Sequence, residues 1–317
     1  MATADPPVHT KLRRLVSKAF TPRRISELEP RIRQIAGELL SNTEGSSEID
    51  AMAALANPLP MIAIAELLGI SVADHAQFRR WSDDLVSSFA QDLASGPAAA
   101  GFAAEEALRS YLGEAIKQRR RNPSDDLISA LVAARDEHDA LSENESVALV
   151  ILLVLAGNET TAKLIGNGLL ALSRHFDRQR QLREQPTLIP RAIEEMLRYD
   201  SPVQLTLRIA ATTVVSGTEI PTGSLAIILL GAANRDPAQF QRPELFDVGR
   251  EPNEQAALGE GIHFCLGSPF ARLEAAVAID LMLEKFQRLR LANLEAKLEY
   301  RASLALRGLS KVPLMVH

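Results

Sequence analysis

The only cysteine of this 317-residue chain, Cys265, stands in a glycine-rich loop that leads directly into a helical pattern. The loop, residues 258–267, has the sequence Leu-Gly-Glu-Gly-Ile-His-Phe-Cys-Leu-Gly. Ser268 and Pro269 follow it and precede apolar residues at helical spacing, which predicts a helix with the proline in its first turn. Cys265 is therefore expected at or just before a helix N-terminus. Unpaired backbone N–H groups and the positive end of the helix dipole lower the pKa of a thiol there.

Two interpretations of this cysteine remain open on local pattern alone. In the first, Cys265 is a metal ligand, because a coordinated metal deprotonates a thiol outright. Gly259, Gly261 and Gly267 would then let the backbone turn tightly and a flat ligand approach it. In the second, Cys265 is a small buried hydrophobic residue, as most isolated cysteines are. A zinc site is not supported, because the chain has no second cysteine.

Composition places the chain in a broad class. With 46% hydrophobic residues it is long enough for a sizeable core, and without repeats or low-complexity linkers we expect one domain over residues 1–317. A net charge of -5 gives no electrostatic signature of nucleic-acid binding. A single cysteine excludes an internal disulfide and fits a reducing compartment.

Membrane insertion and secretion are also not indicated. The longest unbroken apolar run, residues 147–156, is too short for a bilayer, which needs about 20 residues. The polar N-terminus has no apolar signal core. We therefore expect a cytoplasmic protein with no membrane and no nucleic-acid partner.

The periodicity of apolar residues predicts a mainly α fold with small β-sheets. Thr21 and Pro22 open a segment with one apolar stripe reaching Leu39, and Ser142 with Glu145 forms a capping box that starts a long helix ending about His175. Further helical segments are expected at residues 55–69, 73–90 and 102–120. Short β-rich segments follow Pro202, at residues 203–210, 213–215 and 225–230, and near the C-terminus at residues 303–306 and 312–316.

The long helix contains a polar interruption immediately after its most apolar stretch. Residues 156–161 place a glycine, an acid and two hydroxyls where burial is costly unless a cavity or a ligand uses them. Thr160 has a hydroxyl that can bond back to a carbonyl one turn earlier. The alternative is a surface turn of an ordinary amphipathic helix, and the pattern alone does not choose between the two.

The cysteine loop as a whole resembles the haem-binding loop of the cytochrome P450 family, in which the cysteine thiolate is the axial ligand of haem iron. Leu258 stands where that family usually has phenylalanine. The resemblance implies a cytochrome P450 fold and makes Cys265 the metal ligand. It also makes Gly267 part of the cofactor-binding loop.

The same resemblance assigns roles elsewhere in the chain. Ala156 and Gly157 would line the groove over the haem, and the acid–alcohol pair Glu159 and Thr160 would relay protons to bound dioxygen. The Glu195-x-x-Arg198 motif, one face of a helix at i and i+3, would form an ion pair behind the haem. Arg250 is expected as its third partner, with Leu245 standing where the family often has arginine.

Haem would bring two carboxylates that require positive partners. Four residues match family positions for this purpose, and each on its own is otherwise an exposed charge or a satisfied histidine. Arginine suits carboxylates through its planar fork of donors. The candidates are His9, Arg13, Arg208 and His263.

The implied function is that of a bacterial-type monooxygenase with haem b as cofactor and dioxygen as co-substrate. It would insert one oxygen atom into a small hydrophobic substrate, in a pocket lined by residues 150–160, 202–206 and 303–306. Since the chain has no flavin or nicotinamide motif, electrons are expected from a separate ferredoxin or flavin-type donor protein.

Compared with the family, the chain begins at the helix that carries His9 and Arg13. The expectation is an N-terminally truncated fold without the N-terminal sheet, the first helices and the distal loop. Water would then enter the site more easily, and apolar surface would favour association.

Two other hypotheses stay open at this point. In the first, the chain is a haem-binding remnant without monooxygenase turnover. In the second, it is a thiol-nucleophile enzyme in which His263 acts as the base for Cys265. The second lacks a residue that would orient that histidine.

Overall fold

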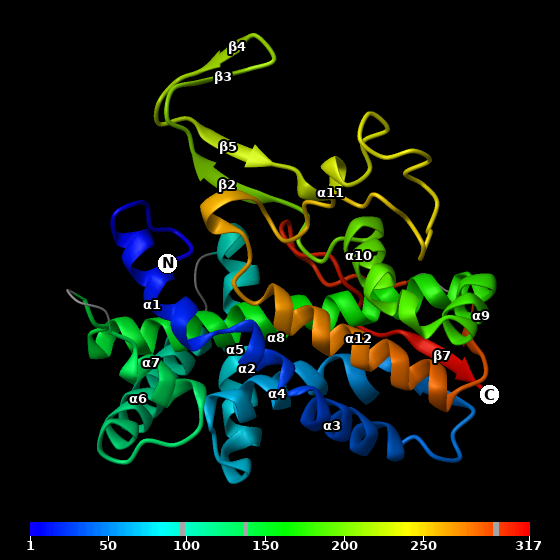
Figure 1. The fold of residues 1–317 in the computed structure, drawn as a ribbon, viewed down its shortest axis with the longest axis horizontal. Coiled ribbons are helices and arrows are strands. Elements are labelled where there is room, and N and C mark those ends of the chain that lie inside the picture. Colours follow the sequence, from blue (N-terminus) through cyan, green and yellow to red (C-terminus); the bar gives the residue numbers. More distant parts are fainter. Residues whose placement is uncertain (96–98, 136–138, 294–297) are drawn as a thin grey trace.

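The computed structural model describes residues 1–95, 99–135, 139–293 and 298–317. In these residues the chain forms twelve α-helices and seven short strands, which confirms the mainly α fold with small sheets. Figure 1 shows the helices packed into one body from which a β-hairpin protrudes.

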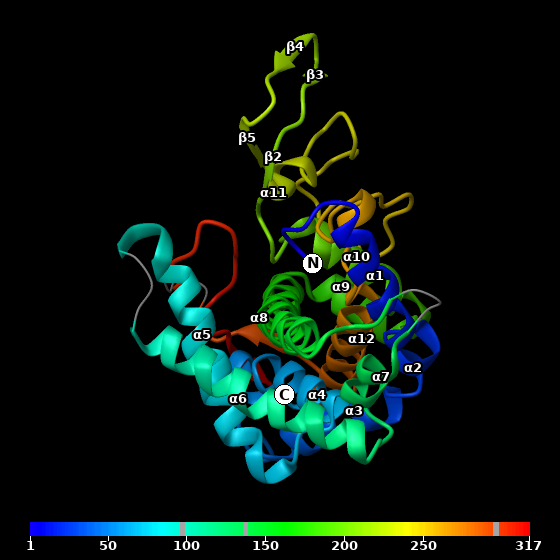
Figure 2. The same cartoon turned by 90° about the vertical axis from the view of Figure 1, so that its left-hand side faces the viewer.

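The longest helix, α8 (Glu143–Arg174), runs through the middle of the molecule and is seen end-on in Figure 2, with other helices around it. It begins with the expected capping box. The Ser142 hydroxyl accepts the Glu145 N–H at 3.2 Å, and the Glu145 carboxylate accepts the Ser142 N–H at 2.8 Å. It packs against α4 (Pro58–Leu68), α5 (His75–Ser95), α6 (Ala99–Arg121), α10 (Ile189–Tyr199) and α12 (Ser268–Lys285).

By length and composition α8 is apolar enough to cross a membrane, the only such helix in the residues that the structure describes. However, 56% of its most apolar window is buried inside the protein. The apolar residues of α8 therefore serve largely as core of the helical body.

The N-terminal part differs from its expected course at one point. The apolar stripe from Thr21 to Leu39 belongs to two helices, α2 (Pro22–Ser26) and α3 (Glu29–Ser41), rather than to one segment. Pro30 lies in the first turn of α3 and has no amide hydrogen to donate to a preceding turn, so the helix restarts there. The preceding helix, α1, spans Val8–Ala19.

The other expected helices are present with small shifts of their ends. The segment at 55–69 is a π-helical turn, Met52–Ala56, followed by α4, and the segments at 73–90 and 102–120 are α5 and α6. The shorter helices are α7 (Leu127–Ala133), α9 (Phe176–Glu184) and α11 (Leu230–Ala233), and 3-10 turns span Val72–Asp74, Pro186–Leu188 and Gly261–His263.

Three antiparallel sheets complete the fold. Strands β1 (Glu48–Asp50), β7 (Pro313–Val316) and β6 (Leu289–Leu291) form one sheet in that order. Strand β2 (Thr206–Ile209) pairs with β5 (Leu225–Ile228), and β3 (Thr213–Val215) pairs with β4 (Thr218–Ile220). The turn between β3 and β4 uses Ser216 and Gly217 at positive φ, the conformation that suits a two-residue hairpin loop.

Two expectations for the strands were wrong. Residues 303–306 form no strand, and only Leu306 makes an isolated bridge, to Val203. The strand expected from residue 203 begins at Thr206. In addition, β1, β4 and β6 have three residues each and carry too little periodicity to be found from the sequence.

A buried ion-pair network confirms the expected Glu195–Arg198–Arg250 cluster. Arg198 donates to both oxygens of Glu195, at 2.7 and 2.8 Å, and Arg250 donates to the same carboxylate at 3.0 Å. Arg198 also donates to the backbone carbonyls of Asn234, Pro243 and Leu245. Because Glu195 and Arg198 are fully buried, their pairing fixes α10 against the segment that precedes the cysteine loop.

Candidate active site

The Cys265 loop is closed by its own backbone. The Cys265 N–H donates to the carbonyl of Leu258 at 2.9 Å, and Gly259 and Gly261 take φ values of +75° and +67°. These two glycines adopt the left-handed conformation that other residues resist. Helix α12 begins at Ser268, so Cys265 precedes a helix N-terminus as expected.

The expected lowering of the thiol pKa is wrong for the isolated thiol. Burial raises the pKa of Cys265, and this effect outweighs the opposing influence of the backbone N–H groups of Gly267 and Ser268 and of the Arg13 and Arg272 charges. Removal of water disfavours the anion more than the helix N-terminus favours it. A coordinated metal would hold this residue as a thiolate.

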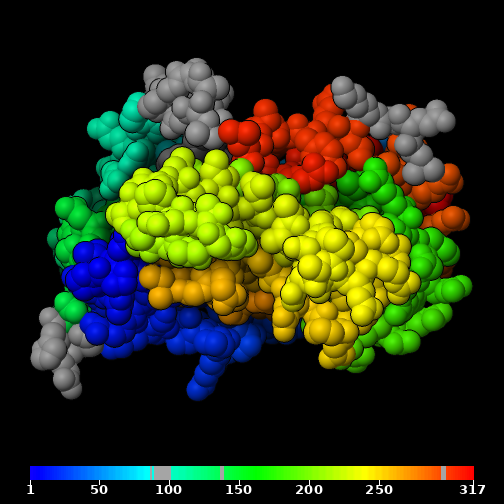
Figure 3. All heavy atoms as spheres, turned by 90° about the horizontal axis from the view of Figure 1, so that it is seen from above, coloured from blue at the N-terminus to red at the C-terminus, as the bar shows by residue number. Residues whose placement is uncertain are grey.

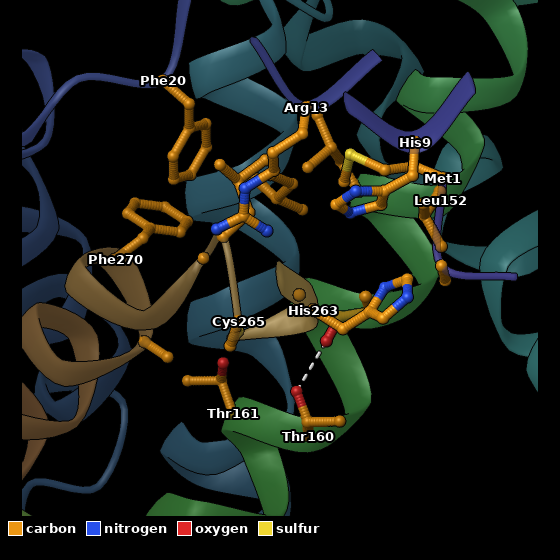
Figure 4. A pocket seen from close by; sticks show the side chains of 18 residues that line it. Met1, His9, Arg13, Phe20, Leu152, Thr160, Thr161, His263, Cys265 and Phe270 are labelled. Carbon is orange, nitrogen blue, oxygen red and sulfur yellow. Dashed lines mark hydrogen bonds between the residues drawn. The ribbon is translucent and has the colours of Figure 1, made fainter. Parts of the chain in front are cut away.

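A cavity of about 210 Å³ lies between Cys265 and α8. Figure 4 shows its lining side chains, with Arg13, His9 and His263 converging on the space beside Cys265. Eight of the ten predicted site residues line it: His9, Arg13, Ala156, Gly157, Thr160, His263, Cys265 and Gly267.

A second cavity, of about 270 Å³, continues the first. The two have six lining residues in common: Ala156, Thr160, Thr161, His263, Cys265 and Ala271. Arg208, on β2, lines the second cavity. The four predicted cationic residues therefore meet in one region, although they lie on α1, on β2 and in the cysteine loop.

These four residues fit the carboxylates of a haem. The rings of His9 and His263 lie 4.5 Å apart between centroids, and Nε2 of His9 is buried without a hydrogen-bond partner. Over residues 1–95, 99–135, 139–293 and 298–317, neither Arg13 nor Arg208 has a carboxylate within ion-pair distance. A bound dianion would supply the missing acceptors.

The electrostatic environment of His263 also favours binding of an anion among these cationic residues. Its pKa is lowered, chiefly by burial and next by the charges of Arg208, His9 and Arg13, while Asp5 acts in the opposite sense. The mutual repulsion of these cations decreases when an anion binds among them.

Small residues leave room for a flat group over the cysteine. A Cβ atom added to Gly157 would meet no atom within 4 Å, and one added to Gly267 would meet only Sγ of Cys265, at 3.9 Å. Ala156 also presents only a methyl group to both cavities. The thiol, the cationic cluster and the open wall of α8 together fit a haem.

The acid and the alcohol of the predicted proton relay lie on different sides of α8. Thr160 lines the Cys265 cavity, and its hydroxyl donates to the carbonyl of Ala156 at 2.5 Å, one turn earlier (Figure 4). Glu159 does not line that cavity. It faces a separate polar cavity, where its carboxylate accepts a hydrogen bond from Lys163.

The substrate-facing wall is partly as expected. Leu152, Leu153, Pro202, Val203 and Thr206 line the two cavities at Cys265. The expected contribution of residues 303–306 is not observed there, because Ser303, Leu304 and Leu306 line a different cavity, of about 400 Å³.

Sequence reasoning missed several lining residues. Phe270 and Ala271 could have been found, because they follow Cys265 on the first turns of α12. Ile64 on α4 and Phe20 after α1 carried no local signal, because only the packing of those segments brings them to the site.

Fold and site together define a class: a mainly helical protein whose single cysteine faces a central helix across a space suited to haem. The comparison with protein families agrees, since the cytochrome P450 model matches residues 1–304. The chain belongs to the cytochrome P450 family.

Individual relatives are similar over nearly the whole chain. Cytochrome P450 CYP107DY1 of Priestia megaterium is 45% identical over 316 residues, which cover 99% of this chain and 76% of that protein. Vitamin D(3) 25-hydroxylase of Pseudonocardia autotrophica is 43% identical over 316 residues, 99% of this chain and 77% of that protein. The structure of the Bacillus subtilis cytochrome P450 PksS has a TM-score of 0.93 at 41% identity, covering 98% of this chain and 80% of the other.

Family membership establishes the general activity. The chain is a cytochrome P450 monooxygenase, an oxidoreductase that uses haem b and dioxygen, takes its electrons from a redox partner and binds a hydrophobic substrate. This activity replaces the hypothesis of a thiol-nucleophile enzyme.

Proposed function

We propose that this protein inserts one oxygen atom of dioxygen into a hydrophobic organic substrate at the space between Cys265 and α8. The observation that carries the proposal is the joint placement of Cys265, the four cationic residues and Thr160 around connected cavities. When bound, haem supplies the iron at which dioxygen is reduced.

Each candidate site residue has a defined task in this proposal. Sγ of Cys265 would hold the haem iron as a thiolate and would supply negative charge to it. His9, Arg13, Arg208 and His263 hold the haem carboxylates by charge-assisted hydrogen bonds. Ala156, Gly157 and Gly267 keep the space free that the flat group needs.

Proton supply is assigned to the acid–alcohol pair. The Thr160 hydroxyl lines the cavity beside Cys265 and holds the last proton at Oγ1. Glu159 takes up protons in the polar cavity on the other side of α8. General acid catalysis of this kind requires each donor to come within hydrogen-bond reach of the next acceptor.

The chemical class of the substrate and of the electron-donor protein is also part of the proposal. Aliphatic side chains such as Leu152, Leu153 and Val203 line the cavities, which favours an apolar substrate. Several of the relatives carry the name of a hydroxylase, among them vitamin D(3) 25-hydroxylase and 6-deoxyerythronolide B hydroxylase. A ferredoxin or a flavin-type protein in the cytoplasm is the proposed electron donor.

The test of the ligand is the reduced, carbon-monoxide difference spectrum. The wild-type protein is expected to show a strongly red-shifted Soret band, and Cys265→Ala is expected to lose it. Ser26→Ala, a similar exchange at an exposed residue of α2, serves as the control and should leave the band unchanged. An unshifted wild-type band would contradict thiolate ligation by Cys265.

Turnover separates the monooxygenase from a haem-binding remnant. With a surrogate ferredoxin pair or with peroxide, the monooxygenase converts a hydrophobic substrate into an oxygenated product. A red-shifted band without product from any substrate that shifts the haem spectrum would support the remnant instead.

A further inference from the structure

The ribbon of β2 and β5 presents one face to the Cys265 cavities and the opposite face to solvent. Side chains alternate between the two faces of a strand, so residues two apart share a face. Thr206 and Arg208 line the second Cys265 cavity. Leu207 and Ile209 alternate with them along β2 and therefore point away from that cavity. The ribbon itself extends beyond the helical body (Figures 1 and 2).

The face of the ribbon that points away from the cavities is entirely apolar. In the antiparallel register Leu207 lies opposite Ile227. Ile209 lies opposite Leu225, so these four side chains share one face, which we call the outer face. They are between 47% and 69% exposed. Contiguous apolar surface of this kind marks a site at which another molecule binds.

The outer face continues into a cavity of about 400 Å³. Leu205 and Leu229 extend the two strands by two residues beyond the outer face, and they line this cavity together with Leu304. Leu229 and Leu304 are also exposed. A protruding apolar ribbon and a hollow with leucine side chains in its wall therefore lie next to each other.

The composition of the ribbon argues against a charged protein or a membrane as its partner. Between residues 203 and 230 the only charged residues are Glu219, on β4, and Arg208, on the inner face. A charged surface laid on the outer face would lose its water without gaining an ion pair. Residues 203–230 also contain no aromatic residue and no lysine, which proteins commonly use at membrane interfaces.

A second copy of the same face meets these conditions. A two-fold axis brings two identical patches together, so each patch must be complementary to itself. Two uncharged apolar faces, each beside a hollow, can pack in this way and leave no charge buried between them.

The size of the patch predicts a reversible association. Stable specific interfaces bury about 800 Å² on each partner. Complete burial of one aliphatic side chain removes roughly 60–120 Å² from water. Six side chains that are already half covered supply about half of the required area or less. We therefore expect a dimer that forms as concentration rises rather than a permanent one.

Arg208 connects the outer face to the haem site. In the part of the chain that the structure describes, its guanidinium donates only within its own strand, to Oγ1 of Thr206 at 3.0 Å and to the carbonyl of Leu207 at 2.8 Å. A two-stranded ribbon without further packing is marginally stable. The position of Arg208 therefore depends on a strand whose outer face is uncovered.

We propose that the outer face docks on the same face of a second copy of this chain, and that the dimer holds β2, and with it Arg208, in place for the haem carboxylates. Covering the outer face stabilises the ribbon, so less freedom is lost when an anion binds to Arg208. By linkage, haem binding strengthens dimer formation by the same factor as dimer formation strengthens haem binding. The coupling rests on the role of Arg208 proposed above, whereas the docking surface does not.

Sedimentation equilibrium of the haem-loaded protein tests the docking surface. The wild type is expected to follow a monomer–dimer equilibrium, and Leu207→Thr/Ile227→Thr is expected to raise the dimer dissociation constant at least tenfold. Threonine keeps the strand propensity of both positions. Val72→Thr, at an exposed apolar residue outside the ribbon, should equal the wild type. A monomeric wild type, or a double variant with the wild-type dissociation constant, overturns the proposal.

Hydrogen exchange of the wild type tests the same surface without any substitution. The amides of residues 206–209 and 225–228 are expected to exchange at least threefold more slowly above the dimer dissociation constant than below it. Exchange at the ribbon that does not depend on concentration contradicts the proposal.

Co-sedimentation with vesicles of phosphatidylcholine and phosphatidylglycerol tests the other apolar partner. Neither the wild type nor Leu207→Thr/Ile227→Thr is expected to bind. Binding of the wild type alone would assign the outer face to a membrane surface and overturn the proposal.

The rate of haem transfer to apomyoglobin, measured above and below the dimer dissociation constant, tests the coupling. The wild type is expected to release haem at least threefold more slowly as a dimer. Arg208→Gln should release haem faster, lose this concentration dependence and still form the dimer. Concentration-independent release from a wild type that dimerises refutes the coupling and leaves the docking surface standing. Wild-type release from Arg208→Gln refutes instead the role of Arg208 in haem binding.

Discussion

At the residue scale, the clearest feature outside the proposed mechanism is a buried acid. Glu274 on α12 has no exposed surface, and neither of its carboxyl oxygens has a hydrogen-bond partner in the part of the chain that the structure describes. Burial raises the pKa of this carboxyl well above its ordinary value, because an isolated anion in the core lacks solvation.

This pKa shift predicts a pH dependence of stability. In the unfolded chain Glu274 releases its proton at about pH 4.3, whereas the folded protein retains it to higher pH. Between these two values the folded state binds more protons than the unfolded state, so the free energy of unfolding falls as pH rises, by up to about 1.4 kcal/mol per pH unit. Above the folded pKa the fall ends.

Urea unfolding of wild type and Glu274→Gln over this range checks the prediction. The variant has no titrating group at this position, so the difference in unfolding free energy between variant and wild type should grow as pH rises. Glu284→Gln, at an exposed position of the same helix, should follow the wild-type curve. Parallel curves for Glu274→Gln and wild type would show that the buried carboxyl has no shifted pKa.

At the scale of elements, two glycines predict opposite effects of an alanine substitution on stability, one at the end of a helix and one inside a helix. Gly69 ends α4 at φ +76°, and a Cβ there would lie 2.3 Å from Oδ2 of Asp126. Gly113, inside α6, has ordinary helical geometry and no atom within 4 Å of such a Cβ.

Gly113→Ala should therefore stabilise the protein by about 0.5–1 kcal/mol, because alanine loses less backbone entropy in a helix. Gly69→Ala should destabilise it by more than about 1 kcal/mol, because the new methyl group forces a left-handed residue against the N-cap of α7 (Leu127–Ala133). Thermal and urea unfolding measure both. A stabilising Gly69→Ala would refute the close contact with Asp126.

Elements with strong local signals were predictable from sequence. The capping box of Ser142 and Glu145 located the start of α8, and Ser268 with Pro269 located the start of α12. Strands β1 and β6 were not predictable, because each has three residues and is held by pairing with β7 rather than by a signal in its own sequence. Pro30 marks the break between α2 and α3 in the sequence, but the apolar stripe continues across it, so the pattern predicted one segment.

At the scale of the whole molecule, the protruding hairpin exposes apolar surface. Figure 3 looks down on this face, with the hairpin, residues 206–228, in front of the cysteine loop. Ile209 and Leu225, opposite each other on β2 and β5, are 69% and 60% exposed, and Leu207 and Ile227 are also exposed. Unpaired strand edges with apolar side chains favour association.

The prediction is concentration-dependent self-association that the double variant Ile209→Thr/Leu225→Thr reduces. Threonine keeps the strand propensity and removes apolar surface. Sedimentation equilibrium should give a lower weight-average mass for the variant than for the wild type. Val72→Thr, at an exposed apolar residue away from the hairpin, should not change it. Equal masses for the double variant and the wild type would locate association elsewhere.

The sequence by itself supplied the candidate site residues. The loop around Cys265 and the polar block of α8 were found from local patterns, because backbone geometry and capping act within a few residues. The four cationic residues were found through the resemblance to the cytochrome P450 family. That residues 1–317 form one domain, and the roles assigned to the individual site residues, stay predictions.

Only the tertiary structure decided the surroundings of those residues. It brought the rings of His9 and His263 to 4.5 Å, raised the pKa of the Cys265 thiol by burial, and turned Glu159 toward Lys163. The physical reason is that solvation, charge neighbours and packing space come from segments far apart in the chain. A helical pattern places a side chain on a helix, but the elements that pack around the helix decide what that side chain meets.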